Sequence, residues 1–145
     1  MRTIRGLLVV TIFGGLVLAG WLLPQASGEK KGETRVFEMR TYYAAPGKMA
    51  ALHQRFSQHT CKLFAKHGIT IVGFWVPTDP QGAENKLVYI VAFPSKEAAD
   101  KSWKAFRADP VWIEVKKKTE AEGPLLKKDG IVSEYLNPTD YSPIK

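Results

Sequence analysis

The segment from Asn85 to Trp112 reads NKLVYIVAFPSKEAADKSWKAFRADPVW, and it decides the fold. Its first part, Lys86 to Phe93, is a continuous apolar run with β-branched and aromatic residues, which predicts a strand covered on both faces. Pro94 ends that strand because proline has no N–H for a sheet ladder. Ser95 can then cap a helix, and Asp109-Pro110 closes this helix and begins another. The segment therefore predicts a buried strand followed by two helices.

The remaining elements follow from the alternation of apolar and polar residues and from the positions of proline and glycine. They are a strand over residues 35–43, a helix from 46 to 67, strands over 69–76 and 131–136, turns at 78–82 and 129–130, and an irregular tail from 137. The order is β-α-β-β-α-(α)-β, which is the ferredoxin-like α+β plan. The sequence therefore predicts an antiparallel sheet of four strands with helices on one face.

The predicted central strand is apolar on both of its faces. Val88, Ile90 and Ala92 alternate along it with a second apolar set that begins at Leu87 and ends at Phe93. Because helices cover only one face of such a sheet, the other face would expose an apolar surface, and surfaces of this kind mark interaction sites. A second copy packed sheet to sheet would cover it. We therefore expect a homodimer whose two sheets form a dimeric α/β-barrel.

The composition excludes several classes of protein. With 45% hydrophobic and 24% charged residues, the chain has the composition of a globular domain. Its net charge is +7, and the one run of lysines, Lys116–Lys118, is interpreted as a solvated helix face. No basic helix is interleaved with aromatic residues, so we expect no nucleic-acid partner. Cys61 is the only cysteine, which excludes a disulfide within the chain, and we expect it to be partly exposed or to lie at a subunit contact.

The N-terminal residues 1–28 have the features of a targeting segment. Two arginines come first, an apolar run occupies residues 6–23, and small residues follow. This order predicts a secretory signal peptide that is cleaved after Gly28. Because the apolar run exceeds the usual signal core of about 7–15 residues, an uncleaved N-terminal membrane anchor is the alternative. In either case we expect the domain, residues 35–145 after a linker at 29–34, to be exported to the periplasm or the extracellular space.

Several stretches of the chain resemble the NIPSNAP family. They are RVFEMRTYYAAPGK at residues 35–48, KHG and GFWVPTDP at 66–68 and 73–80, the segment 85–112, and LNPTDYSP at 136–143. The resemblance implies a dimeric α/β-barrel. That superfamily also contains small monooxygenases and haem-dependent enzymes, whereas NIPSNAP proteins have no settled reaction. Animal members are linked to mitochondria and vesicle traffic, and because this chain is expected to be exported, those roles are not carried over.

Candidate ligand-binding residues come from the polar face of the first strand, which carries Glu38, Arg40 and Tyr42. We expect Trp75 and Tyr89 to face the same space from neighbouring strands, inside the barrel. There Arg40 would hold the carboxylate or phosphate of a small amphipathic or anionic ligand, and aromatic rings would hold its apolar part. The alternative is a Glu38–Arg40 ion pair that helps to seal the dimer.

The histidines His53, His59 and His67 all fall on one predicted helix. Their spacings give no pair at i and i+4 and no HExxH motif, so we predict no metal site. We interpret His59 as a core histidine and His67 as a favourable charge at the helix C-terminus. No cofactor is predicted, and the aromatic residues of the last two helices, such as Trp103 and Trp112, are assigned to the core.

Two functions remain open. The first is an exported dimeric barrel that binds a small ligand or a protein through its interior. The second is a cofactor-independent monooxygenase or isomerase that uses barrel-lining tyrosine, histidine or carboxylate groups. The chain contains no GxSxG, P-loop, GxGxxG or CxxC motif that would name a reaction. We favour the first function and assign no catalytic residues.

Overall fold

The structure is a computed structural model that describes residues 35–145, and the predicted leader and linker lie outside these residues. Its elements are β1 (Val36–Ala44), α1 (Met49–Arg55), the π-helical turn η1 (Phe56–Thr60), α2 (Cys61–Lys66), β2 (Thr70–Trp75), α3 (Pro80–Ala83), β3 (Lys86–Phe93), α4 (Lys96–Ala108), α5 (Pro110–Thr119) and β4 (Leu126–Leu136). The predicted order of strands and long helices is confirmed. Within the described range, no helix is both long and apolar enough to cross a bilayer.

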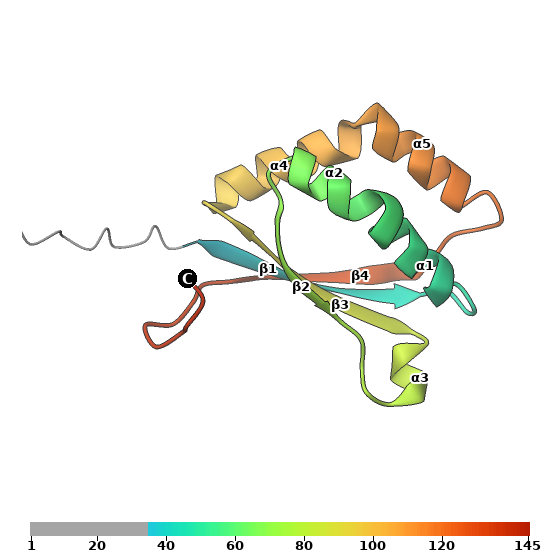
Figure 1. Cartoon of the computed structure of the whole chain (residues 1–145), viewed down its shortest axis with the longest axis horizontal. Helices are drawn as coiled ribbons and strands as arrows, with labels where there is room; N and C mark the ends of the chain where they lie inside the picture. The colour runs from blue at the N-terminus through green and yellow to red at the C-terminus, as the bar shows by residue number, and fades with distance from the viewer. Residues whose placement is uncertain (1–34) are drawn as a thin grey trace, which may run out of the picture. The chain divides into compact units, whose positions relative to one another are not determined.

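The strands form one antiparallel sheet in the order β2-β3-β1-β4. The hairpin of β2 and β3 carries the short helix α3 at the tip predicted for residues 78–82 (Figure 1). Figure 1 also shows α1, α2, α4 and α5 together on one side of the sheet. This is the ferredoxin-like α+β fold that the sequence predicts. Among the described residues, no long helix covers the other face.

Local chemistry fixes where α4 and α5 begin. Ser95 accepts a hydrogen bond from the Ala98 amide at 3.1 Å and so caps α4. Asp109 accepts one from the Val111 amide at 2.8 Å and caps α5, where Pro110 occupies the first turn. Both caps are those that the sequence predicts.

The helix-facing side of β3 lies at the centre of the core. Its residues Leu87, Tyr89, Val91 and Phe93 are each at most 2% exposed. The ring of Phe56 packs against the Tyr89 ring with 5.4 Å between centroids. On the opposite face of the same strand, Val88 and Ile90 remain half-buried. The two faces of the central strand therefore differ in how completely the described chain covers them.

Strand β4 is longer than predicted, because it begins at Leu126. The turn predicted at residues 129–130 is wrong, since these residues form a bulge inside the strand, where the register with β1 shifts between Tyr42 and Ala44. A Cβ atom at Gly130 would lie 2.8 Å from backbone carbonyl oxygens on both strands, so only glycine fits there. The residues at 129–130, which predicted a turn from the sequence, form a β-bulge in the structure.

Candidate functional site

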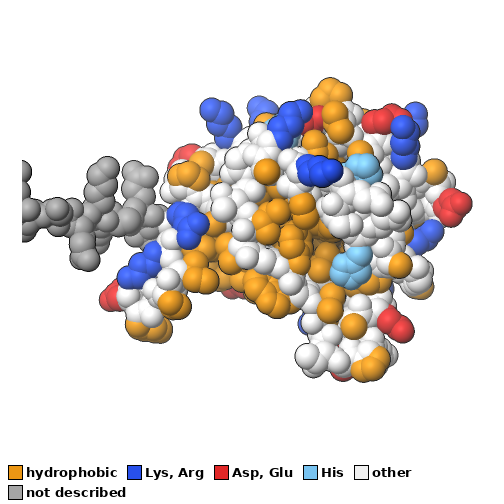
Figure 2. All heavy atoms as spheres, in the orientation of Figure 1, with side chains coloured by type: hydrophobic (Ala, Val, Ile, Leu, Met, Phe, Trp, Pro, Cys, Tyr) orange, Lys and Arg blue, Asp and Glu red, His pale blue; other side chains and the backbone are white. Residues whose placement is uncertain are grey.

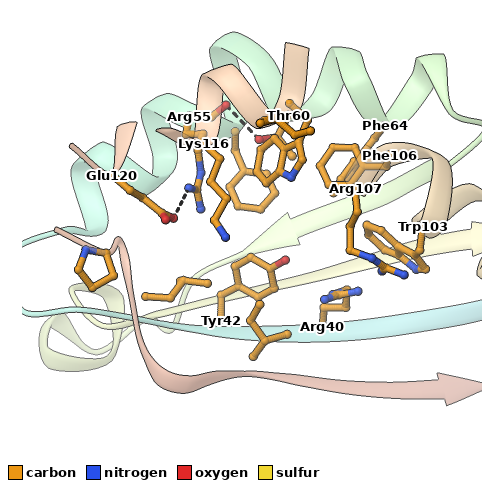
Figure 3. Close-up of a pocket in the computed structure, with 16 residues that line it drawn as sticks. Arg40, Tyr42, Arg55, Thr60, Phe64, Trp103, Phe106, Arg107, Lys116 and Glu120 are labelled. Atoms are coloured by element: carbon orange, nitrogen blue, oxygen red, sulfur yellow. Dashed lines mark hydrogen bonds and ion pairs between the residues drawn. The ribbon is translucent and has the colours of Figure 1, made fainter. Parts of the chain in front are cut away.

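A cavity of about 550 Å³ lies between the sheet and the helices (Figure 3). Strands β1 and β4 form its floor, and α1, η1, α2, α4, α5 and the segment after α5 form its walls. Figure 2 shows hydrophobic side chains gathered between the helical layer and the sheet on one side of the molecule. The volume of the cavity is in the range of small-molecule sites. We therefore treat it as the candidate binding site.

Aromatic rings make up much of the cavity wall. They are Tyr42, Phe56, Phe64, Trp103, Phe106 and Trp112. These rings support one another: the Phe64 and Trp103 centroids are 5.3 Å apart, and those of Phe106 and Trp112 are 4.5 Å apart. Mutual contacts of this kind hold the rings in fixed orientations. The last-helix aromatics assigned to the core therefore also form an apolar surface for a ligand.

The Glu38 carboxylate is buried beneath α4 and fully paired. It is 2% exposed, and it accepts hydrogen bonds from Trp103 Nε1 at 2.5 Å, from Arg40 Nη1 at 3.1 Å and from the Ser133 hydroxyl. The Glu38–Arg40 ion pair considered from the sequence is thus present. It lies on the helix-facing side of the sheet, however, where it joins β1 to α4 and β4.

The Arg40 guanidinium lies flat against the aromatic wall, 4.4 Å from the centre of the Trp103 ring. Burial by itself lowers the pKa of this group, but the neighbouring Tyr42 and Tyr89 hydroxyls and the Glu38 carboxylate outweigh that effect and raise its pKa above the ordinary value. Arg40 therefore stays charged, and Glu38 already balances much of its charge.

Four of the five predicted site residues lie on the helix-facing side of the sheet. Arg40 and Tyr42 line the cavity, and Glu38 and Tyr89 are buried against its lining residues. They therefore face away from the open side of the sheet, where a second sheet would pack, and the predicted position inside a barrel is wrong for them. Alternation along β1 separates its two faces, but it does not tell which face the helices cover.

Trp75 lies on the opposite face, so its predicted grouping with the other candidates is wrong. A bulge within residues 71–73 shifts the register of β2 by one residue and exchanges the faces of the residues that follow. As a result Phe74 turns toward the helices, where its ring centre is 5.3 Å from that of Phe56. Trp75 instead pairs with Val88 and is 49% exposed.

The π-helical turn η1 follows directly after Arg55, which lines the cavity. Within this turn the Thr60 hydroxyl donates a hydrogen bond to the Arg55 carbonyl oxygen at 3.2 Å. The Arg55 side chain is 4% exposed, donates to Glu120 Oε1 at 2.7 Å and lies 5.3 Å from the centre of the Trp112 ring. Arg55, like Arg40, is therefore paired with a carboxylate and held against an aromatic ring.

Sequence reasoning missed the charged residues Arg55, Arg107, Lys116 and Glu120, all of which line the cavity. A usable signal was present for two of them. Arg107 lies four residues after Trp103, and Lys116 lies four residues after Trp112, so each cation shares a helix face with a cavity tryptophan. Lys116 is exposed, as the solvated helix face predicts, and it also lines the cavity.

The Tyr89 hydroxyl is fully buried and has no hydrogen-bond partner in the described part of the chain. Its ring lies 5.2 Å from that of Tyr42. Burial raises the pKa of Tyr89 well above its usual value, because the phenolate form would lose its hydration. Tyr89 therefore carries a neutral hydroxyl, which can donate a hydrogen bond.

None of the three histidines lines the cavity. His59 is half-buried, and its predicted core position is wrong because η1 changes the phase of the helix and places Phe56 and Thr60 in the core instead. Cys61 is half-buried, which confirms the expected partial exposure, and burial raises the pKa of its thiol. Within residues 35–145, no three His, Cys, Asp or Glu side chains are arranged to hold a metal ion.

Asp109 joins the end of α2 to the junction of α4 and α5. Its carboxylate is 2.7 Å from Lys66 Nζ and 2.6 Å from His67 Nε2, in addition to its bond from the Val111 amide. The hydrogen bonds from Lys66 and His67 hold the pKa of Asp109 well below its usual range. The carboxylate thus ties together the helices that roof the cavity.

The fold and the cavity together define a ferredoxin-like α+β protein with a cavity between its sheet and its helices. The chain belongs to the NIPSNAP family, whose family model matches residues 37–143. None of the curated proteins compared with the chain matches it.

Solved structures support the same fold. An uncharacterised NIPSNAP-like domain protein from Burkholderia xenovorans is 21% identical and has a TM-score of 0.65, over 77% of this chain and 90% of that one. A NIPSNAP family protein of unknown function from Agrobacterium tumefaciens is also 21% identical with a TM-score of 0.65, over 79% and 96%. A Streptomyces coelicolor monooxygenase, solved in complex with nanaomycin D, is 14% identical with a TM-score of 0.54, over 78% and 95%. At these identities the likeness concerns the fold alone.

Proposed function

We propose that the protein binds a small amphipathic molecule, with an apolar body and an anionic group, in the cavity between its sheet and its helices. The observation that carries this proposal is the composition of the lining, in which six aromatic rings accompany four cations, Arg40, Arg55, Arg107 and Lys116, and one carboxylate, Glu120. Aromatic walls suit a flat or branched apolar body, and the excess of positive charge suits an anion.

The proposal includes export and a homodimer. The apolar leader supports a place outside the cytoplasm. On the open face of the sheet, Val132 is 54% exposed and Trp75 is 49% exposed, which supports a second copy packed against this face. Such a dimer would leave the cavity accessible, because the cavity lies on the other side of the sheet.

A cofactor-independent oxygenase is the second candidate, and the Tyr89 hydroxyl favours it. This buried hydroxyl lies beside the cavity residue Tyr42 and has no partner among the described residues, so a bound compound would be its natural acceptor. The monooxygenase with the same fold adds to this case. Binding without catalysis is preferred because Glu38 and Glu120 are both paired with arginines, which leaves neither carboxylate free as a base.

Native mass spectrometry of the protein purified from its host, with identification of the released compound, tests the binding function. We expect one small anionic compound per chain, and a loss of at least about tenfold in its occupancy in the Trp112→Ala variant, which removes one wall. Trp75→Ala, on the opposite face, is the matched control. Equal occupancy in both variants would place the compound elsewhere and contradict the proposal. Oxygen consumption that Tyr89→Phe abolishes would favour the oxygenase.

A further inference from the structure

The four cations that line the cavity fall into two pairs with different surroundings. Arg55 is buried, Arg40 is half-buried with its side chain 14% exposed, and each has a carboxylate partner, at 2.7 Å and 3.1 Å respectively. Arg107 and Lys116 are exposed, and neither has a hydrogen-bond or ion-pair partner among the described residues. The positive charges deep in the cavity are therefore paired with carboxylates. The positive charges where the cavity meets solvent have no such partner among the described residues.

The direction of the two unbalanced side chains is informative. Figure 3 shows Arg107 and Lys116 extending from the helices toward β1, across the space that the rings enclose. Both lie in the last turn of their helices, where the helix dipole favours a cation. The dipole does not account for their direction, however, since Lys104 and Lys117 on the same helices are exposed and do not line the cavity.

A second observation concerns the Nε–H groups of the two arginines that have carboxylate partners. The Nε–H groups of Arg40 and Arg55 are buried and have no acceptor within residues 35–145. Buried donors in native structures nearly always have a partner, which is often a ligand or a water molecule. Both arginines line the cavity, so its occupant is expected to carry acceptor atoms and negative charge rather than donors and positive charge.

We propose, on the basis of the binding function above, that Arg107 and Lys116 hold the anionic head of the ligand at the mouth of the cavity. The body of the ligand then lies inward against Trp103, Phe106 and Trp112. The ligand class is an aromatic or polycyclic anion with a single carboxylate, sulfonate or phosphate head. Arg40, to which sequence reasoning gave the role of anion holder, instead positions the Trp103 ring and balances Glu38.

The proposal is tested with two fluorescent probes that share one aromatic skeleton, the anionic anilinonaphthalene sulfonate and the neutral phenylnaphthylamine. Full-length protein is titrated with each probe, energy transfer from tryptophan to the probe reports binding, and the Trp112→Ala variant tests whether the binding is at the cavity. We expect the wild type to prefer the anionic probe and the Arg107→Ala/Lys116→Ala variant to bind it about tenfold more weakly, with neutral-probe affinity unchanged. The preference should also fall as salt is added, because the two cations are exposed.

Matched variants separate charge from packing. Lys104→Ala/Lys117→Ala removes the same charge from the same helices and should leave both affinities unchanged. Arg107→Lys/Lys116→Arg keeps the charges and should restore the preference for the anion. If the Arg107→Ala/Lys116→Ala variant keeps the full preference, the proposal is overturned while the binding function stands. If neither probe binds, or if Trp112→Ala binds both as the wild type does, the binding function fails, and the proposal with it.

Discussion

The two faces of the sheet differ, because charged side chains are covered by helices on one face and apolar side chains are exposed on the other. On the helix-facing side, β1 contributes the charged residues Glu38, which is buried, and Arg40, whose side chain is 14% exposed. On the open side, it contributes the apolar residue Met39 and also Thr41, and Val132 of β4, which pairs with Thr41, is 54% exposed. Helices can cover the polar face because Trp103 and Ser133 donate hydrogen bonds to the Glu38 carboxylate. The apolar face is covered only in part, since Phe37 is buried whereas Val132 and Trp75 are exposed.

This difference assigns separate roles to the two faces. A cavity with rings and cations occupies one side, and an apolar surface suited to a second copy occupies the other. A substitution on one face should therefore change ligand binding or the stability of the chain without changing association, and a substitution on the other should do the reverse. The predictions below test this separation, from the largest expected effect to the smallest.

The largest effect is expected for Glu38→Ala. Removing this carboxylate leaves the charge of Arg40, in a side chain only 14% exposed, unbalanced and leaves the buried Trp103 N–H without an acceptor. We expect a loss of about 3–5 kcal/mol in the free energy of unfolding, measured by urea denaturation. Glu84→Gln, an exposed glutamate beside α3, should change it by less than about 0.5 kcal/mol. A Glu38→Ala variant as stable as this control would show that the buried cluster does not hold the helices on the sheet.

The next effect concerns the open face. Val132→Asp places a carboxylate in the proposed sheet-to-sheet contact, where it would lose hydration without gaining a partner. We expect the dimer dissociation constant to rise by about 100-fold, corresponding to about 3 kcal/mol, as measured by light scattering over a concentration series. Val111→Asp changes an equally exposed valine on the helical layer and should leave the dimer intact. Dissociation by both variants, or by neither, would count against the open face as the interface.

The element order and both helix caps could be predicted because they depend on neighbours in sequence, as in Ser95 with Ala98 and Asp109 with Val111. The position of site residues depends on two irregularities that the sequence does not announce. The bulge at residues 71–73 moves Trp75 to the open face, and the π-helical turn at 56–60 removes His59 from the core. Each inserts one residue into a regular period and changes the face of everything that follows.

The partners of the buried charges were beyond prediction for a different reason. Glu38 and Trp103 are 65 residues apart in sequence, and so are Arg55 and Glu120. Which distant residues meet depends on how the helices lie across the sheet, and the alternation of β1 alone leaves both of its faces available to them. The sequence therefore predicted a small-ligand site, but it did not place that site on the correct side of the sheet.

The smallest effect is expected for Asp109→Asn, which weakens the joint between the helices that roof the cavity. Because the folded-state pKa of Asp109 lies below its ordinary value, its contribution to stability is full above about pH 4 and is lost as the pH falls further. Urea midpoints measured at pH 7 and at about pH 3 should show a smaller acid loss in this variant than in the wild type. Asp140→Asn, in the exposed C-terminal segment, should keep the wild-type acid loss.

The central claim is that the binding site lies within one chain, on the helix side of the sheet, and not between two sheets. It is tested most directly by native mass spectrometry of the Val132→Asp variant with anilinonaphthalene sulfonate. The account predicts a monomer that binds one probe molecule per chain, with an affinity within about twofold of the wild type, since the cavity does not involve the altered face. A monomer that no longer binds the probe, while the wild-type dimer does, would contradict it and place the site between the two sheets.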